Sequence, residues 1–466
     1  MHDLRRQVLE SGKTVSRKAR SRIASGTPSK VSSAVNSPAH SRATSRNPSR
    51  QNSDDEDDLS DGTAWRFSIR CCAGECALTG LLGSTNSIDD LLNGEDGDLP
   101  IDAWKSELKT RVEQIIDRKR SSTEGRADSL AAYARILMAR YAKNDIDNRI
   151  RELLPSMIWS IKSEATERET VAALKALAVT VVTIDSDDIY DSVADLLKRT
   201  ISDSGSTPIK ANAIHALGIA AFLGGASEDE MEDIMALLLE IIESDGLSVD
   251  AHDEGSVVIA ALEEWGLLAT QIDDLENATE AAMEAFVDQL QSSDSGVQIA
   301  AGENIALLYE KSYTPLEEDE EISDEGLDSD DDEPRTGRMV KRYHVYRRQD
   351  QLIHTLDELA NISTRKISKK DRKTLHSSFA DIRNSVEKPA RGPKYSTALD
   401  QETGRSYGGG RMKVKINRSV EVRIDRWWKL QRLNALRRVL QGGFTYHYDE
   451  NEVVSGCLPF SMTSKR

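Results

Sequence analysis

LAAYARIL at residues 130–137 is the first of five alanine-rich stretches that decide the fold of this chain. The others are TVAALKAL at 170–177, KANAIHAL at 210–217, GSVVIAAL at 255–262 and AAGENIAL at 300–307. Their last leucines, at positions 137, 177, 217, 262 and 307, are spaced by 40, 40, 45 and 45 residues. A period of about 40–47 residues with two or three helices per unit is typical of armadillo and HEAT repeats. Small alanine side chains let neighbouring helices approach closely, and leucines and isoleucines fill the space between layers.

Further helices are predicted between these stretches, at Ile189–Ile201, Met231–Ile242 and Leu275–Leu290, with turn residues separating them. The region from 101 to 313 shows no strand-like alternation of apolar and polar residues. The sequence therefore predicts an all-α protein, with an armadillo/HEAT-like α-solenoid over residues 100–315.

Charged residues are unevenly distributed along the chain, which has a basic start, an acidic middle that includes the solenoid, and a basic end. Residues 1–50 carry 11 basic and 2 acidic residues, residues 334–466 carry 29 and 13, and residues 51–333 carry 21 and 64. The overall net charge of −18 hides this arrangement. Because salt screens charges beyond about 8–10 Å, a partner meets the local charge and not the total.

The flanking segments are predicted to be disordered. Residues 1–99 are a Ser/Arg-rich and then acidic tail, and residues 316–339 are an acidic linker with 12 acidic residues between 317 and 333. In the tail, Ser45, Ser49 and Ser53 each follow an arginine by three residues, and in the linker Ser323 and Ser329 precede acidic residues. These five serines are candidate phosphorylation sites. A plain flexible tail and a solvated spacer are the simpler alternatives.

Residues 340–452 form a basic C-terminal region with three predicted helices, Tyr346–Ile362, Lys369–Val386 and Val422–Gln441. A short run at 412–416 is expected to be extended, and Gly442-Gly443 is expected to end the last helix. That helix has leucines at 430, 433, 436 and 440 on one face, so we expect it to dock through leucine and to expose the arginines around the rim.

Three basic clusters in this region are candidate nucleic-acid contacts. The strongest has six basic residues in nine, at 365–373; the second contains Arg411, Lys413, Lys415, Arg418 and Arg423; the third is Lys341-Arg342 with Arg347-Arg348, interleaved with tyrosines. Basic residues neutralise phosphates and release counterions, and interleaved aromatic residues stack on RNA bases. The run at 365–373 would equally serve as a nuclear localisation signal or as a solvated helix start.

No catalytic constellation is visible, and the sequence predicts no enzyme activity, no cofactor and no small-molecule substrate. Three of the four cysteines lie at 71, 72 and 76, a pattern that does not complete a zinc site. Four cysteines also make no disulfide framework, and no apolar stretch is long enough to span a membrane. His215 is expected to lie in or on a repeat helix. The aromatic run Tyr446-His447-Tyr448 favours buried packing, with base stacking as the alternative.

Three stretches resemble the interferon-related developmental regulator family. QIAAGENIALLYE at 298–310 is similar to the family's "R-I-A-A-G-E-x-[LI]-A-L-L-[FY]-E". SKKDRK at 368–373, leading to Val386-Glu387, is similar to its basic helix. The stretch from Asp425 to Glu452, with Val439–Gly443, Tyr446-His447 and Asn451-Glu452, is similar to its C-terminal motif. The family usually continues with another helix and a Lys/Arg-rich tail, whereas residues 453–466 diverge.

The resemblance implies a non-enzymatic protein that binds ribosomes and represses translation in the cytoplasm. It also implies an alternative, a nuclear co-regulator whose solenoid binds corepressor complexes of the histone-deacetylase type. The expected partners are therefore the ribosome and its RNA, or proteins on the solenoid surface, and no membrane. The residues expected to contact ribosomal RNA are Lys366, Lys369, Lys370, Arg372, Lys373, Lys413, Lys415, Arg426, Arg437 and Arg438.

Overall fold

The computed structural model describes residues 103–315, 339–361, 369–389, 391–395, 397–399, 406–408 and 412–462. The five candidate phosphorylation sites, the cysteines at 71–76 and Lys366 lie outside these residues.

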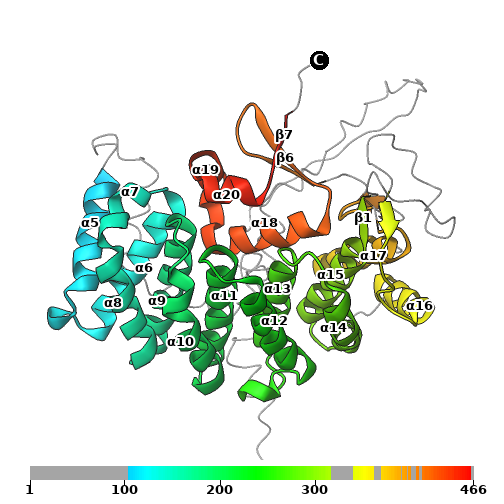
Figure 1. The fold of residues 1–466 in the computed structure, drawn as a ribbon, viewed down its shortest axis with the longest axis horizontal. Coiled ribbons are helices and arrows are strands. Elements are labelled where there is room, and N and C mark those ends of the chain that lie inside the picture. Colours follow the sequence, from blue (N-terminus) through cyan, green and yellow to red (C-terminus); the bar gives the residue numbers. More distant parts are fainter. Residues whose placement is uncertain are drawn as a thin grey trace, which may run out of the picture. The chain divides into compact units, whose positions relative to one another are not determined.

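The described helices pair into helical hairpins that stack side by side (Figure 1). The pairs are α5 (Ala103–Ile116) with α6 (Thr123–Ala139), α8 (Ile150–Ser163) with α9 (Glu167–Thr183), α10 (Ile189–Asp203) with α11 (Thr207–Leu223), α12 (Glu228–Glu243) with α13 (Gly255–Ala269), α14 (Glu276–Gln289) with α15 (Ser295–Lys311), and α16 (Gln349–Ala360) with α17 (Lys369–Glu387). The predicted α-solenoid is confirmed. The pair α16/α17 continues the array on α15, beyond the acidic segment.

The second helix of each pair belongs to an inner row, in which α6, α9, α11, α13, α15 and α17 contact one another in that order. The five alanine-rich stretches lie in the first five of these helices. An inner helix has neighbours on most sides and is therefore apolar around its circumference: α9 is buried from Glu169 to Thr183 except at Lys175. Alanine is small enough for this crowded position.

Local sequence signals begin several of these helices. The side chains of Thr166 and Ser206 accept hydrogen bonds from backbone N–H groups in the first turns of α9 and α11. Ser227 and Glu230 form a reciprocal capping box at the start of α12, and Asp294 caps α15. Such caps satisfy N–H groups that have no partner within the helix.

The acidic segment leaves and rejoins the array at one place, because β1 (Tyr313–Pro315) pairs antiparallel with β2 (Met339–Lys341). A second small antiparallel pair joins β3 (Thr397–Leu399) to β4 (Ser406–Gly408).

The C-terminal part begins with β5 (Met412–Lys415) and β6 (Val420–Ile424), an antiparallel hairpin to which β7 (Ser461–Met462) adds a third strand. α18 (Trp427–Leu440), the 3-10 turn Gln441–Gly443, α19 (Phe444–Glu450) and α20 (Glu452–Cys457) lie between β6 and β7. The expected extended run at 412–416 is confirmed. The predicted helix start at Val422 is wrong, because Val420, Val422 and Ile424 alternate with Glu421 and Arg423 as strand residues, and the helix starts at Trp427.

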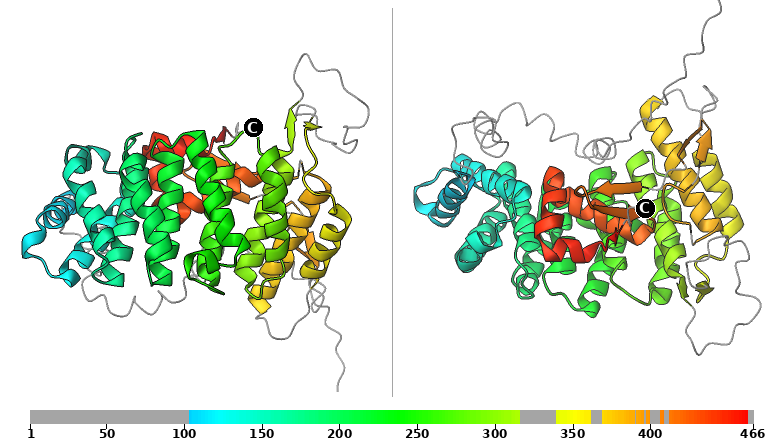
Figure 2. Two further views of the ribbon diagram at one scale, coloured as in Figure 1. Left: turned by 60° about the horizontal axis from the view of Figure 1, so that its bottom comes forward. Right: turned by 90° about the horizontal axis from the view of Figure 1, so that it is seen from above.

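α18 lies across the inner row and contacts α6, α9, α13 and α15 (Figures 1 and 2). Leu433, Leu436 and Leu440 are buried, and the helix ends just before Gly442-Gly443, as expected. The C-terminal helices therefore fill the inner face of the solenoid. Within the described ranges, no helix is both long enough and apolar enough to cross a membrane.

Candidate nucleic-acid interface

The β5–β6 hairpin separates apolar from basic side chains. Val414 is paired with Val422, and Met412 with Ile424, on the face that packs against the core. The opposite face and the turn expose four basic residues, Lys413, Lys415, Arg418 and Arg423. Because side chains alternate along a strand, burying the valine face fixes the basic face towards solvent.

The charge of the exposed hairpin face is strongly positive. Glu421 shares the face, and its Oε1 atom lies 3.1 Å from Nζ of Lys413. One carboxylate therefore stands against four basic side chains, which leaves a local charge of about +3.

The hairpin turn is held in place by Asn417. Its Oδ1 atom accepts hydrogen bonds from the backbone N–H groups of Ser419 at 2.8 Å and Val420 at 2.9 Å. Its Nδ2 atom donates to Oδ1 of Asp449 in α19, at 3.0 Å. These bonds fix the turn against α19, so the basic face is a positioned surface.

The basic run at 365–373 lies elsewhere. Lys369 and Lys370 begin α17, Arg372 is half-buried and Lys373 is exposed. The opposite end of α17 touches the C-terminal part, where Nε1 of Trp427 donates to Oγ of Ser385 at 2.8 Å. About 14 residues of helix, roughly 20 Å, separate Ser385 from the basic run. The described part of the run, 369–373, therefore lies at the end of α17 that is distant from this contact.

The third cluster lies at β2 and before α16. Arg342 donates from Nε to the hydroxyl of Thr314, and Arg347 has an Nη2 atom 3.5 Å from Oε1 of Glu280. Arg347 and Arg348 are exposed.

The leucine spacing of α18 predicts that Arg437 and Arg438 lie on an exposed rim. The structure contradicts this prediction. Arg437 is only 5% exposed and stacks on the ring of Phe444. Arg438 is paired with Oε1 of Glu264 and lies 3.3 Å from Oε2 of Glu263, both in α13. Arg438 therefore attaches α18 to the solenoid, whereas Arg437 packs within the C-terminal part. Arg426 is half-buried at the N-cap of α18.

Glu310 anchors the other end of α18. Its Oε2 and Oε1 atoms accept hydrogen bonds from the backbone N–H groups of Trp427 at 2.8 Å and Trp428 at 3.1 Å. These are N–H groups of the first helical turn, where a carboxylate is favoured. Burial nevertheless raises the pKa of Glu310 to about 7, against the lowering effect of these donors and of Arg426.

We expect Glu310 to make stability depend on pH. Its folded-state pKa is above its ordinary value of 4.5, so its contribution to stability falls as pH rises from about 4.5 through 7. A shift of this size corresponds to roughly 3 kcal/mol. Glu310→Gln cannot titrate there. The free energy of unfolding of the wild type minus that of the variant should therefore decrease between pH 5 and pH 8 in urea titrations; a constant difference would contradict the assignment.

The residues of the C-terminal motif bind the ends of two inner helices. Nε2 of His447 donates to the carbonyl oxygen of Leu137 in α6 at 2.7 Å, and Nδ2 of Asn451 donates to that of Val182 in α9 at 2.9 Å. These carbonyls belong to the last helical turns, which lack partners within the helix. Burial lowers the pKa of His447, which favours the neutral ring that this bond uses. His447 and Tyr448 are buried, in agreement with the packing interpretation, and Tyr446 remains exposed.

Two adjacent glycines offer a matched test of this docking. A Cβ atom on Gly443 would lie 1.8 Å from the carbonyl oxygen of Met138, whereas one on Gly442 would meet nothing within 4 Å. We expect Gly443→Ala to destabilise the protein by about 1–3 kcal/mol or more, because the backbone of α6 would have to move. Gly442→Ala should change the urea midpoint little. Equal midpoints for the two variants would contradict the close packing.

Other chemical groups of the described residues do not form a comparable site. Burial raises the pKa of the Cys457 thiol to about 11, so this cysteine is not a reactive thiolate. Asp245, His252 and Asp253 place three possible metal-ligating atoms within 4.8 Å of one another at the surface. Exposed acidic groups are common without an ion. His215 lies in α11, with Nδ1 at 2.8 Å from Oε1 of Glu264.

Sequence reasoning missed the polar contacts that hold α18 on the solenoid. A signal was present: Glu264 lies between apolar runs of α13, and Glu310 directly follows the apolar run 305–309 of α15. A buried charge requires a partner, so each of them pointed to a basic residue or a helix N-terminus elsewhere in the chain.

Sequence comparison identifies relatives of this chain. The chain is 25% identical to an uncharacterized protein of Schizosaccharomyces pombe over 360 residues, which cover 77% of this chain and 75% of the relative. It is 24% identical to interferon-related developmental regulator 2 of Mus musculus over 80% of this chain and 77% of the relative. It is 23% identical to interferon-related developmental regulator 1 of Homo sapiens over 77% and 73%. The family model for the interferon-related developmental regulators matches residues 80–387. The chain therefore belongs to the interferon-related developmental regulator family.

Proposed function

We propose that the exposed face of the β5–β6 hairpin binds ribosomal RNA, and that the protein is a non-enzymatic, ribosome-associated repressor of translation in the cytoplasm. One observation carries the proposal: the hairpin buries its valines and presents Lys413, Lys415, Arg418 and Arg423 together to solvent. A positively charged surface whose turn is fixed by hydrogen bonds is suited to a phosphate-rich partner.

The basic start of α17 would supply a second contact. It lies roughly 20 Å from the end of α17 that touches α18, so one RNA surface would meet two separated basic sites. Phosphate contacts position a protein on RNA without reading its sequence. A ribosome offers such a surface in a fixed geometry, and both contacts would then act together.

The alternative function, a nuclear adaptor for corepressor complexes, would use the solenoid as a protein-binding surface. The inner row, where repeat proteins usually bind partners, is covered here by α18. An adaptor would therefore need the outer row or the release of α18. This requirement favours the RNA proposal.

Sedimentation on sucrose gradients tests the proposal. The full-length chain from cell extract should comigrate with ribosomes at low salt and dissociate at high salt, because the phosphate contacts release counterions. Lys369→Glu/Lys370→Glu/Lys373→Glu should lose this comigration while keeping its fold by circular dichroism. If the triple variant comigrates with ribosomes as the wild type does, with the same salt dependence, α17 is not part of the interface. A wild-type chain that stays at the top of the gradient at low salt would contradict ribosome binding altogether.

Point variants are preferable to a truncation at residue 333. Such a truncation would remove α16 and α17 from the end of the array and α18 from the inner row. The helices it uncovers are apolar on those sides, so loss of binding would not distinguish a missing contact from a damaged solenoid.

A further inference from the structure

Trp159 stands apart from the hydrophobic core of the solenoid. Leu153, Met157 and Ile161 of the same helix, α8, are fully buried, whereas Trp159 is 52% exposed. Tryptophan has the largest side chain, and leaving it in water needs a reason, because burial of its ring is strongly favourable.

Arg118 covers one face of the Trp159 ring. The guanidinium carbon lies 4.1 Å from the ring centroid, and that of Arg126 lies at 5.9 Å. Arg118 is fixed there by hydrogen bonds from Nη1 to the carbonyl oxygen of Ser156 at 2.6 Å and to Oγ of Ser160 at 2.7 Å. With Arg118 over the ring and half of the residue exposed, part of the ring remains open to solvent.

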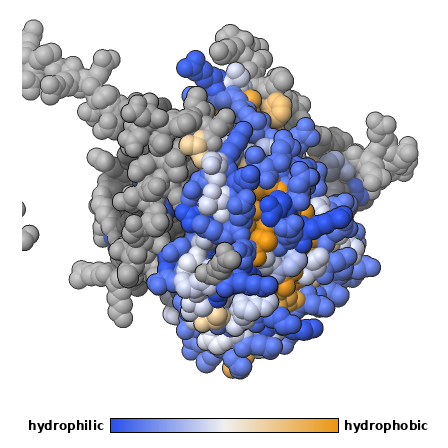
Figure 3. All heavy atoms as spheres, turned by 90° about the vertical axis from the view of Figure 1, so that its left-hand side faces the viewer, coloured by the Kyte–Doolittle hydropathy of each residue, from blue (hydrophilic) through white to orange (hydrophobic). Residues whose placement is uncertain are grey.

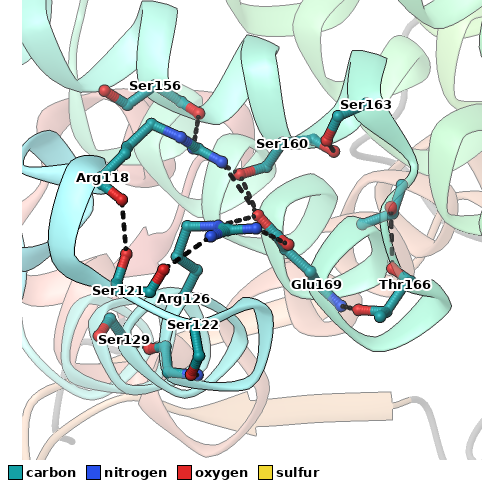
Figure 4. Close-up of polar contacts among 12 residues, drawn as sticks. Arg118, Ser121, Ser122, Arg126, Ser129, Ser156, Ser160, Ser163, Thr166 and Glu169 are labelled. Atoms are coloured by element: carbon teal, nitrogen blue, oxygen red, sulfur yellow. Dashed lines mark hydrogen bonds and ion pairs between the residues drawn. The ribbon is translucent and has the colours of Figure 1, made fainter.

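A buried carboxylate holds both arginines (Figure 4). Glu169 of α9 accepts from Nη2 of Arg118 at 3.0 Å and from Nε and Nη2 of Arg126 at 2.8 and 2.9 Å. Ser160 also donates to Oε1 of Glu169, at 3.0 Å. The cations are therefore placed before any ligand arrives, and little side-chain entropy remains to be lost on binding.

Exposed lysines lie close in sequence to the ring and to Arg118, beside the exposed Asp117 and Glu164. Lys119 follows Arg118 and is exposed, and Lys162 lies one turn beyond Trp159 on α8 and is also exposed. Figure 3 looks onto the end of the array where α5 and α8 lie, and its coloured surface is mainly hydrophilic with a narrow apolar strip. A broad apolar patch, which would indicate a protein partner, is not seen in that coloured part.

We infer that Trp159, backed by Arg118, is a stacking platform for an unpaired base of RNA, with Lys119 and Lys162 facing the neighbouring phosphates. A base stacks on an exposed aromatic face, and an arginine beneath the ring adds a favourable cation–π contact. Only unstacked bases can use such a platform, so the site selects single-stranded RNA over duplex. The inference extends the proposed RNA binding, but it rests on a different part of the fold from the hairpin.

The test measures binding of full-length protein to a fluorescein-labelled 15-nucleotide oligouridylate, whose bases are unstacked, and to an RNA duplex of the same length, by fluorescence anisotropy. Stacking contributes about 1–3 kcal/mol per base, so Trp159→Ala should weaken single-strand binding about 5- to 140-fold and duplex binding hardly at all. Trp159→Phe should retain part of the affinity. Quenching of tryptophan fluorescence by the oligonucleotide should be smaller in Trp159→Phe than in the wild type.

Charge and fold controls separate the outcomes. Lys119→Glu/Lys162→Glu leaves the ring in place and should weaken single-strand binding and reduce its salt dependence. If Trp159→Ala fails to fold, Trp159→Phe and Lys119→Glu/Lys162→Glu still test the inference. Wild-type binding that is weakened by hairpin variants and unaffected by all three of these variants would overturn the platform alone. No oligonucleotide binding by the wild type, with ribosome comigration retained, would overturn this inference alone. Loss of both would overturn the RNA proposal as well. Capture of a protein through Trp159 without RNA binding would replace the base by a protein ligand.

Discussion

Replacing Lys415 and Arg423 by glutamate is expected to weaken binding of the full-length chain to purified ribosomes roughly 10- to 100-fold at 150 mM salt, because two phosphate contacts become repulsions. The two side chains are exposed on the outer face of the β5–β6 hairpin, one on each strand. Neither lies in the core, so the fold should be retained. The plot of log affinity against log salt concentration should lose about 1.4–1.8 units of slope for the two contacts.

The matched control reverses two basic residues elsewhere. Lys109 of α5 and Arg199 of α10 are exposed on the outer row, away from the hairpin. Lys109→Glu/Arg199→Glu changes the net charge by the same amount, so it corrects for non-specific electrostatic attraction. Equal loss of affinity in the two double variants would show that the total charge, and not the hairpin, determines binding.

Arg438→Met is expected to give the largest loss of stability, about 3–5 kcal/mol, because it takes the arginine away from a buried carboxylate and leaves His215 as the remaining partner. Glu264 has a fully buried side chain, and Arg438 is its partner from α18. Gly218 lies directly against this carboxylate: a Cβ atom there would be 2.1 Å from Oε2 of Glu264. The carboxylate therefore has little room to turn towards water.

Urea denaturation and limited proteolysis measure this effect. The unfolding midpoint of Arg438→Met should fall, and the C-terminal segment should become sensitive to protease as α18 leaves the inner row. Glu264→Gln combined with Arg438→Met should recover part of the loss, because the uncompensated charge is removed. Arg199→Met, on the exposed side of α10, is the control. An unchanged midpoint for Arg438→Met would mean that the ion pair does not hold α18 in place.

The solenoid could be predicted from sequence because its signal is local and repeated. The alanine-rich stretches mark helices that must pack closely on several sides, and they proved to be the inner row. The basic cluster of the hairpin could also be predicted from sequence, because its members lie close together in the chain: Lys413, Lys415, Arg418 and Arg423.

The docking of the C-terminal helices was not predictable in the same way. Arg438 meets Glu264 across 174 residues, and His447 meets Leu137 across 310. Leucine spacing in α18 indicated a docked face, but not that arginines would also point into that interface. The predicted start of α18 was too early because the strand pattern before Trp427 is only five residues long, 420–424, and the helical spacing of leucines follows it closely. Whether a charged side chain faces solvent or a buried partner depends on the tertiary fold, so a local sequence pattern cannot predict it.

The most direct test is a cryo-electron microscopy structure of purified ribosomes with the full-length chain bound at low salt. The account predicts that the exposed face of β5–β6 lies against ribosomal RNA, with Lys415, Arg418 and Arg423 within about 4 Å of phosphate oxygens, the range of an ion pair. It also predicts that α18 remains on the inner row in the bound state. A complex in which the hairpin faces solvent, or in which α18 has left the solenoid so that the inner row makes the contact, would contradict it.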